Sequence, residues 1–499
     1  MDLDPDACYR AILSRDARFD GRLFVAVTST GIYCRPVCPA RTPKRENVRF
    51  FPTAAAAESA GFRACLRCRP ETSPELAVWR GTSNTVSRAL SLIETGALDG
   101  ADVAALAERL GVGERQLRRL FEMHLGASPL AVAQTRRVHL AKQLIHETDL
   151  PMAEVALAAG FGSVRRFNET FQHLYRRPPA ALRRRSNPRE AQPHAVSLRL
   201  RYRPPYDWDA MLAFLSMRAI PGVEIVSGNR YARAVAFGSD QGVIAATPAG
   251  RDCLAVDVRF PRLTALPTIL ARIRRMFDLA ADPLLIGEQL GRDPKLAPLI
   301  EARPGLRVPG AWDGFELAVR GVLGQQITVV AARKLAGKLA QAFGDELPEQ
   351  WREDGLSLTF PRPERLAEAD PALLGMPRAR GLALISLAGA VAADPDLFGP
   401  RRSLEDAIER LRALPGIGEW TAQYIAMRAL REPDAFPAAD IGLLRALAEP
   451  DGTRPTPREL LARAEQWRPW RAYAALHLWA AEAARARPAV ETVDARQAA

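Results

Sequence analysis

A cluster of four cysteines near the N-terminus constrains this chain more than any other feature. Cys34 and Cys38 form a C-x3-C pair, and Cys65 and Cys68 form a C-x2-C pair. Four thiolates at these spacings are a ligand set for one tetrahedral zinc ion, so the segment is expected to fold as a small metal module. Because six cysteines in 499 residues are too few for a disulfide framework, we expect a reducing, cytoplasmic location.

The cysteine spacing leaves two roles open for this module. A closed site of four cysteines can be purely structural and hold the segment together. A metal-bound thiolate placed beside DNA can also act as a nucleophile, because the metal keeps the sulfur deprotonated at neutral pH. Spacing alone does not decide between these two roles.

Charge and hydropathy narrow the class of partner. The formal net charge is +12, which favours a polyanion, most simply double-stranded DNA. The excess of arginine over lysine fits codon bias equally well, but the net charge still favours an anionic partner. No apolar run reaches the roughly 18 residues that cross a membrane, and the first residues contain several aspartates and no secretion signal. A membrane partner is therefore not expected.

The residues around the cysteines narrow their role. Segments 30–38, 45–48 and 61–68 read TGIYCRPVC, RENV and GFRACLRC, and they resemble the N-terminal domain of the Ada adaptive-response family. The resemblance implies one zinc ion held by all four cysteines, with Cys34 as the acceptor of a methyl group from a methylphosphotriester in DNA. Methyl transfer would turn a thiolate into a thioether and make the site one unit less negative, so its affinity for DNA should rise.

Two helix-turn-helix spacings follow the cysteine module. The first has helices at 103–110 and 114–124 around a glycine turn, and the second has helices at 155–159 and 163–174 around another. One such pattern would also fit a generic helical bundle with solvated arginines. Two copies resemble the DNA-binding domain of AraC-type regulators, whose second helices enter successive major grooves. The residues expected to contact DNA are Arg115, Arg118, Arg165 and Arg166.

A glycine turn near the C-terminus characterises the largest block of the chain. The sequence 414–418 reads LPGIG, a turn that leaves backbone N–H groups free at a helix start to hold a DNA phosphate. Asp440 follows in the sequence FPAAD. Without the turn, this aspartate would be interpreted as a helix cap. Together with segments 204–208, 321–328 and 467–473, the turn resembles helix-hairpin-helix DNA glycosylases of the AlkA type, the 3-methyladenine glycosylase II family.

The glycosylase resemblance implies hydrolytic excision of alkylated bases from DNA. Asp440 would be catalytic, by stabilising positive charge on the sugar or by orienting the attacking water. A flipped cationic base would be held between aromatic rings, although aromatic residues at helical spacing also fit an ordinary core. The expected pocket residues are Trp420, Tyr424, Trp470 and Phe214, and the expected DNA contacts are Gly416, Gly418, Gln325 and Gln326.

Several positions refine the expected chemistry. Trp420 stands where bifunctional relatives carry a Schiff-base lysine, so a lyase step is not expected. No cysteine follows Cys253, so the iron–sulfur cluster of some relatives is not expected. Ile441 stands where some relatives carry an aromatic residue beside the catalytic Asp, and Gln326 stands where a leucine can wedge into DNA, so the shape of the pocket and the filling of the gap in the duplex are left open. The Pro-Cys-His-Arg motif of O6-methylguanine methyltransferases is absent, so O6 repair is not predicted.

These segments predict a multidomain, mostly α chain with α+β parts. The predicted function is DNA alkylation repair and its regulation, with alkylated and promoter double-stranded DNA and RNA polymerase as partners. The alternative is a transcriptional regulator whose C-terminal block binds lesions without catalysis. The predicted parts are a zinc α+β module (1–78), an all-α double helix-turn-helix (83–185), a linker (186–196), an α+β subdomain (197–310) that includes strands at 231–237 and 253–260, a helical helix-hairpin-helix core (311–488) and a disordered tail (489–499).

Overall fold

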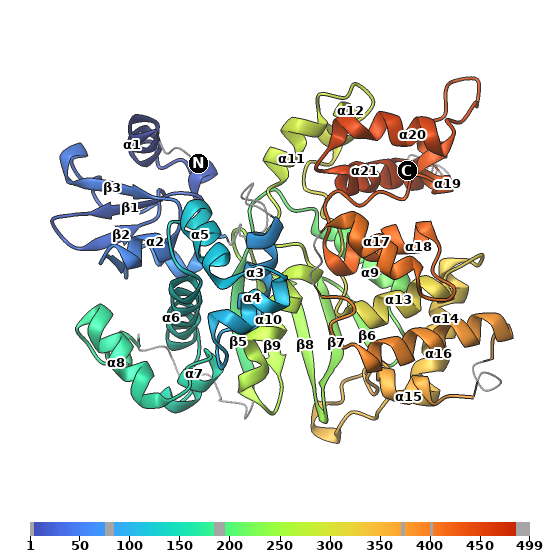
Figure 1. Ribbon diagram of the computed structural model, residues 1–499, viewed down its shortest axis with the longest axis horizontal. Coiled ribbons are helices and arrows are strands. Elements are labelled where there is room, and N and C mark those ends of the chain that lie inside the picture. Colours follow the sequence, from blue (N-terminus) through green and yellow to red (C-terminus); the bar gives the residue numbers. More distant parts are fainter. Residues whose placement is uncertain (1–3, 75–83, 184–194, 371–374, 400–402, 486–499) are drawn as a thin grey trace, which may run out of the picture.

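The chain folds into four regions that follow one another across the molecule (Figure 1). The computed structural model describes residues 4–74, 84–183, 195–370, 375–399 and 403–485. A small sheet and a group of helices occupy one half, a five-stranded sheet lies in the middle, and the C-terminal helices lie on the far side. This succession confirms the predicted fold class. Among the described helices, none combines the length and the hydropathy needed to cross a membrane.

The first region, the N-terminal module (residues 5–72), is a small mixed sheet with two α-helices. Its strand order is β3-β1-β2-β4, and β2 and β4 run parallel. Tyr33 pairs with Ala64 in this parallel ladder, so Cys34, the last residue of β2, and Cys65, which directly follows β4, lie side by side at its end. The elements are α1 (Pro5–Leu13), β1 (Phe24–Val27), β2 (Ile32–Cys34), β3 (Val48–Phe51), α2 (Ala54–Ser59) and β4 (Arg63–Ala64).

The second region, residues 84–182, is helical. The predicted helix pairs are present as α4 with α5 and α7 with α8; α4 has the predicted bounds, and no end of the other helices is shifted by more than three residues. The structure adds a long helix, α6, which connects the two pairs and which the sequence analysis did not predict. The second helix of each pair buries one face, with Phe121 on α5 and Phe171 on α8 fully enclosed. The helices are α3 (Asn84–Glu94), α4 (Val103–Leu110), α5 (Glu114–Leu125), α6 (Pro129–Glu147), α7 (Met152–Ala158) and α8 (Val164–Tyr175).

The third region, residues 195–310, contains an antiparallel sheet of strand order β5-β9-β8-β7-β6. The two predicted strands are present as β7 and β9, and β5, β6 and β8 were not predicted. Most of the predicted linker falls on 184–194, outside the described residues, and its last two residues already belong to β5. The elements are β5 (Ala195–Arg201), α9 (Trp208–Arg218), β6 (Glu224–Ser227), β7 (Arg230–Phe237), β8 (Asp240–Pro248), β9 (Cys253–Arg259), α10 (Leu266–Met276), α11 (Pro283–Leu290) and α12 (Ala297–Ala302).

The fourth region, residues 314–485, is a helical bundle around the buried helix α13. A segment of π-helix, Ala426–Leu430, continues directly from α18, and such bulges occur often at functional sites. The predicted tail 489–499 lies outside the described residues. The helices are α13 (Gly314–Leu323), α14 (Val329–Phe343), α15 (Pro363–Ala367), α16 (Arg378–Ala393), α17 (Leu404–Arg412), α18 (Glu419–Ile425), α19 (Ile441–Ala446), α20 (Pro457–Ala464) and α21 (Arg471–Arg485).

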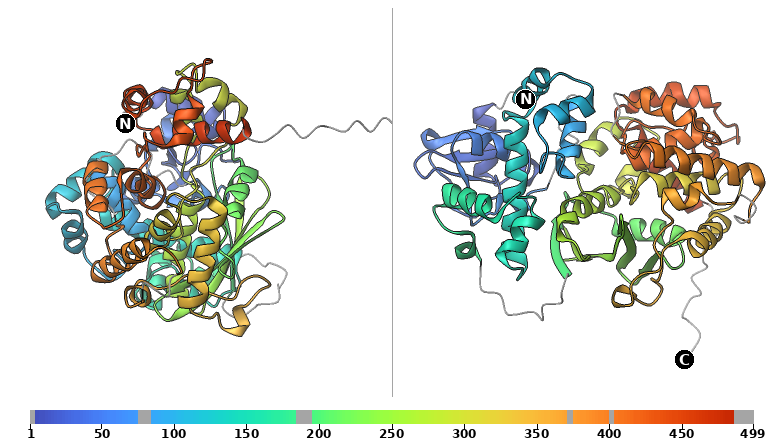
Figure 2. Two further views of the ribbon diagram at one scale, coloured as in Figure 1. Left: turned by 90° about the vertical axis from the view of Figure 1, so that its right-hand side faces the viewer. Right: turned by 60° about the horizontal axis from the view of Figure 1, so that its bottom comes forward.

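Helix α6 covers the edge of the five-stranded sheet. Strand β5 is an edge strand, and such strands leave backbone groups to be satisfied from outside the sheet. The Gln143 amide donates to the Arg199 carbonyl at 2.9 Å, and the Glu147 carboxylate accepts from the Arg199 N–H at 2.9 Å. Apolar side chains of α6 to α8 share one core with the sheet. Figure 2 shows α6 standing between the N-terminal module and this sheet.

A buried arginine joins the cysteine-bearing module to the third region. Arg203 follows β5 and donates to the backbone carbonyl of Asp20 at 2.6 Å. The Asp20 carboxylate accepts from Arg35 Nε at 2.8 Å, and Arg35 is the residue after Cys34. These contacts place the cysteine cluster and the C-terminal half of the chain in one continuous packed structure.

Candidate functional site

The four sulfur atoms of the N-terminal module form a compact cluster. The Sγ atoms of Cys34, Cys38, Cys65 and Cys68 all lie within 4.8 Å of one another. Zinc–sulfur bonds of about 2.3 Å in a tetrahedron require sulfurs roughly 3.8 Å apart, so this cluster fits one zinc ion. Cys65 and Cys68 are buried, whereas Cys34 and Cys38 are half-buried. The first pair is therefore the one that a large substrate can approach.

Backbone N–H groups and the neighbouring thiols determine how the four sulfurs ionise. The Arg35 N–H donates to Cys68 Sγ and the Arg67 N–H donates to Cys65 Sγ, both at 3.4 Å. Hydrogen bonds with the other three cysteines raise the pKa of Cys34, and hydrogen bonds, first with Cys34, lower the pKa of Cys65. Four thiols this close cannot all ionise unless a cation lies between them. The donor set is therefore suited to a divalent metal that prefers thiolates.

The four arginines predicted to contact DNA all lie on exposed faces of α5 and α8. Arg118 and Arg165 each pair with a glutamate one turn away on the same helix, at 2.5 and 2.8 Å. Among the described residues, Arg115 and Arg166 have no ion pair. Arg115 and Arg166 thus keep their guanidinium groups available for a phosphate or a base edge.

The glycine turn joins α17 to α18. Gly416 has φ +79°, and a Cβ at this position would lie 2.6 Å from the Ala383 Cβ, so both conformation and space require glycine. Gly418 has φ −83° and begins α18, with open space around it. The Gln325 amide donates to the Gly416 carbonyl at 2.8 Å, which makes Gln325 a support of the turn. Gln326 is exposed beside it with φ +59°.

The carboxylate of Asp440 is held by two tryptophans. Trp420 Nε1 donates to Oδ2 at 2.8 Å, and Trp479 Nε1 donates to Oδ1 at 2.8 Å. Oδ1 also caps α19 by accepting the Leu443 N–H at 3.1 Å. The cap and the two indole donors leave the half-buried carboxylate fixed in orientation. A group held in this way is pre-organised to stabilise charge that develops in front of it.

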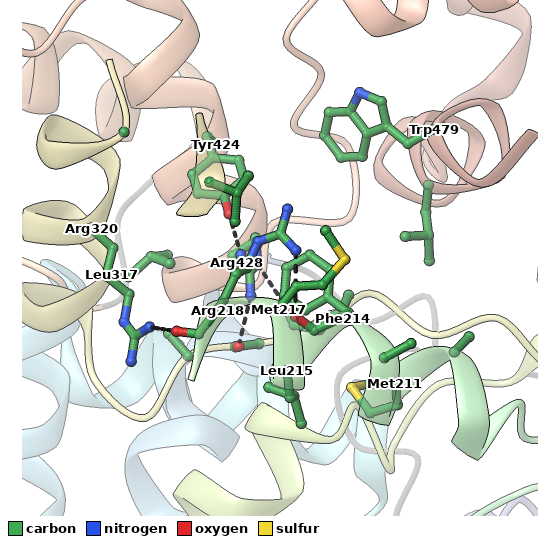
Figure 3. Close-up of a pocket in the computed structure, with 18 of the residues that line it drawn as sticks. Met211, Phe214, Leu215, Met217, Arg218, Leu317, Arg320, Tyr424, Arg428 and Trp479 are labelled. Carbon is green, nitrogen blue, oxygen red and sulfur yellow. Dashed lines mark hydrogen bonds between the residues drawn. The ribbon is translucent and has the colours of Figure 1, made fainter. Parts of the chain in front are cut away.

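A cavity of about 780 Å³ opens in front of this carboxylate. Asp440, Trp420, Tyr424 and Phe214 all line it, so the structure brings together most of the predicted pocket. The Trp420 and Tyr424 rings stack at 5.2 Å with an interplanar angle of 10°. Trp479, which the sequence analysis missed, lines the cavity as well, and Figure 3 shows it across from Tyr424.

The structure places Trp470 elsewhere. Its side chain is only 5% exposed, it does not line the cavity, and its Nε1 donates to Gln289 Oε1 at 3.2 Å. Trp470 precedes α21, whereas Trp479 lies on the face of α21 that packs toward α19. Trp470 is therefore a core residue, and Trp479 takes the place that was expected for it.

Arginine side chains line the cavity together with Asp440. Arg428, from the π-helical segment, donates to the Tyr424 hydroxyl. Burial lowers the pKa of Arg428 to about 10. Burial also raises the pKa of Tyr424, but Arg428 and Arg218 outweigh this effect and leave that pKa below its usual value. No local sequence pattern indicates either arginine, because their place depends on how α9 and α18 pack.

Each region of the chain matches a known protein family. Residues 7–71 match the metal-binding domain of Ada, and residues 106–185 match a helix-turn-helix domain. Residues 197–313 match the AlkA N-terminal domain, and residues 319–472 match the HhH-GPD superfamily of base excision DNA repair proteins.

Known proteins are similar to all or to part of this chain. A probable bifunctional transcriptional activator/DNA repair enzyme AlkA of Mycobacterium tuberculosis is 45% identical over 95% of this chain and 96% of that protein. DNA-3-methyladenine glycosylase 2 of Escherichia coli is 39% identical over 57% of this chain and 96% of its own length. A solved 3-methyladenine DNA-glycosylase from Archaeoglobus fulgidus, at 22% identity, shares the fold over 58% of this chain and 99% of that one, with a TM-score of 0.52.

Proposed function

The chain belongs to the AlkA family of bifunctional transcriptional activator/DNA repair enzymes, and we propose that it excises 3-methyladenine and related alkylated bases at the Asp440 cavity. In the same chain, Cys34 accepts methyl groups from methylphosphotriesters in DNA. The single observation that carries the excision proposal is the Asp440 carboxylate, fixed by two indole donors at the rim of an aromatic cavity beside a hairpin turn.

Asp440 is the proposed catalytic residue of base excision. When the bond between base and sugar breaks, positive charge develops on the sugar, and a fixed carboxylate stabilises it. Water then adds to the sugar carbon, and its proton is lost to a nearby base or to solvent. Because Trp420 and Trp479 hold both oxygens of Asp440, little reorientation is needed at the moment of reaction.

The aromatic residues of the cavity hold the flipped base. Trp420 and Tyr424 present a stacked pair, and Trp479 and Phe214 line the cavity with them. A base removed from the DNA stack loses stacking energy, and contact with aromatic faces replaces part of it. The hairpin at Gly416 and Gly418 would hold a phosphate near the flipped nucleotide, through the N–H groups that the turn leaves exposed.

Cys34 is the proposed methyl acceptor. A zinc ion bound by the four cysteines would keep their sulfurs deprotonated and nucleophilic. Cys34 Sγ attacks the methyl carbon, a C–S bond forms, the C–O bond breaks, and the electron pair stays on the phosphate oxygen as a phosphodiester anion. The half-exposed position of Cys34, beside buried Cys65 and Cys68, supports this choice. Cys38 is half-exposed too, so the experiment must separate the two.

An excision assay with a matched pair of aspartate variants tests the glycosylase proposal. We expect Asp440→Asn to slow release of 3-methyladenine by about 10²- to 10³-fold, the scale of one lost electrostatic group of about 2.7–4 kcal/mol. Asp451→Asn, in an exposed turn, is the control and should excise at the wild-type rate. No release by the wild-type protein, or full release by Asp440→Asn, would favour a regulator that binds lesions without excising them.

Peptide mass spectrometry tests the acceptor proposal. After incubation with DNA that carries methylphosphotriesters, the added methyl group should map to Cys34 in the wild-type protein. Cys34→Ser should acquire none, and transfer to Cys38 in the wild-type protein would reassign the acceptor.

We further propose that the protein acts in the cytoplasm and contacts RNA polymerase when bound at a promoter. The name of the Mycobacterium tuberculosis relative, a transcriptional activator, supports this proposal, as do the exposed arginines of α5 and α8. Transcription in vitro from a promoter that the protein binds should rise when the methylated protein is added. An Arg115→Ala/Arg166→Ala variant should lose this effect.

A further inference from the structure

Two guanidinium groups face the aromatic rings of the Asp440 cavity. Arg218 Cζ lies 3.9 Å from the centroid of the Phe214 ring, and Arg428 Cζ lies 4.3 Å from the same centroid. Arg428 is also 5.1 Å from the Tyr424 centroid. Rings that would attract a cationic base therefore already interact with cations of the protein itself (Figure 3).

Among the described residues, neither arginine forms an ion pair with a carboxylate. Arg428 donates to the carbonyls of Pro309 and Gly310, at 2.7 and 3.3 Å, and to the Tyr424 hydroxyl. Its donors are thus largely engaged in holding the π-helical segment. Arg218 makes one hydrogen bond, from Nη1 to the Phe214 carbonyl at 3.3 Å. Most N–H groups of the Arg218 guanidinium therefore remain available to a molecule bound in the cavity.

The fold fixes Arg218 where it can meet such an occupant. Arg218 is the last residue of α9 and lies one helical turn after Phe214, so the two side chains share a face. The Arg218 carbonyl accepts from Arg320 Nη1 at 2.7 Å, and Arg320 is itself held by Glu316 at 2.6 Å. These contacts fix the C-terminal end of α9. Arg218 lines the cavity together with Asp440.

A fixed cation acts oppositely on two classes of damaged base. A base alkylated on a ring nitrogen carries positive charge, and a cation near it in a partly desolvated cavity opposes its entry. A neutral damaged base with a keto oxygen or a free ring nitrogen accepts a charge-assisted hydrogen bond from a guanidinium, which is stronger than a neutral one. Arg218 should therefore weaken binding of the first class and strengthen binding of the second.

We propose that Arg218 is a specificity-determining residue, which shifts the excision reaction toward neutral damaged bases with acceptor edges and away from cationic ones. This inference rests on the proposed glycosylase function. It assigns to Arg218 a recognition role that is separate from the chemical role of Asp440, because it concerns which base enters the cavity and not how the bond is broken.

Competition between two substrates tests this role. The full-length protein is assayed on an oligonucleotide with one hypoxanthine, a neutral keto purine, and on methylated DNA that releases 3-methyladenine. The 3-methylated base has no keto group and is cationic while it is attached to the sugar. Arg218→Met keeps the apolar stem of the side chain and removes its charge. We expect the ratio of kcat/KM for hypoxanthine to kcat/KM for 3-methyladenine to fall about tenfold or more, with 3-methyladenine release unchanged or faster.

Two further variants make the result decisive. Arg218→Lys keeps the positive charge but loses the planar guanidinium group. Its ratio of kcat/KM values should lie between those of the wild type and Arg218→Met. Arg251→Met removes an exposed arginine of the same region and should leave the ratio unchanged. Retained 3-methyladenine release shows that each variant folds. A ratio unchanged in Arg218→Met would overturn the inference while leaving the glycosylase proposal intact, whereas a wild-type protein that releases neither base would overturn both.

Discussion

Replacement of Trp479 by phenylalanine isolates the contribution of one hydrogen bond to base excision. Trp479→Phe keeps an aromatic ring in the cavity but removes the Nε1 donor that holds Asp440 Oδ1 at 2.8 Å. The Leu443 N–H still reaches that oxygen at 3.1 Å, and Trp420 still holds the other at 2.8 Å. The carboxylate therefore stays in place but loses one of its three donors.

The size of the effect follows from the energy of that bond. A hydrogen bond to a charged group contributes about 1.5–3 kcal/mol, and about 1.36 kcal/mol corresponds to a tenfold change in rate. If the donor orients the carboxylate in the transition state, Trp479→Phe should lower kcat for 3-methyladenine release by roughly 10- to 150-fold. Single-turnover measurement of the released base isolates this step from binding and product release.

Trp470 supplies the matched control for this experiment. Trp470→Phe removes an indole of the same kind, but one that is buried against Gln289 outside the cavity. We expect Trp470→Phe to lower the free energy of unfolding by about 1–2 kcal/mol and to leave kcat of the folded protein unchanged. Excision at the wild-type rate by Trp479→Phe, or equal slowing by both variants at equal folded fractions, would refute the role assigned to the Trp479 donor.

Two further predictions concern the hairpin and the interface of the N-terminal module. Gly416→Ala, where φ is +79° and the new Cβ would approach the Ala383 Cβ to 2.6 Å, should destabilise the protein by about 1–3 kcal/mol, whereas Gly418→Ala should melt as the wild type does in calorimetry. Glu71→Gln, which leaves Lys142 fully buried without its partner at 2.7 Å, should cost about 3–5 kcal/mol. Burial raises the pKa of Glu71, but Lys142 outweighs this effect and brings the pKa to about 2. The stability that this ion pair contributes is therefore full above pH 4.5 and is lost as the pH falls toward 2. In this range the free energy of unfolding should depend more on pH in the wild-type protein than in Glu71→Gln. A pH dependence of the melting temperature that is the same in both proteins would contradict this assignment.

Much of the site could be predicted because its signals are local in sequence. The cysteine spacings specify a ligand set without knowledge of the fold, and the structure brings these sulfurs within 4.8 Å. The LPGIG segment predicts a turn at a helix start, and the structure has that turn, with Gly416 in the left-handed region. The place of Asp440 beside Trp420 was expected from the resemblance to helix-hairpin-helix glycosylases, and the structure joins the two side chains by a hydrogen bond of 2.8 Å.

Other features depend on packing that no local pattern records. Helix α6 was missed because it is buried on several sides, with Arg137, Lys142 and Gln143 enclosed along with its apolar residues, so its sequence lacks one clean apolar face. The sequence analysis assigned Trp470 to the pocket and missed Trp479, because only the packing of α21 against α19 shows which of the two reaches Asp440. Arg218 lines the cavity because α9 packs beside it, which sequence spacing cannot show.

The most direct test of the whole account measures both reactions of one chain in a single incubation. The substrate is DNA that contains both alkylated bases and methylphosphotriesters, and the readouts are free 3-methyladenine and the methylation of Cys34. Asp440→Asn should lose base release and keep methylation of Cys34, and Cys34→Ser should show the reverse. Loss of both reactions in either folded variant, or loss of neither, would contradict the assignment of two separate chemical centres to this protein.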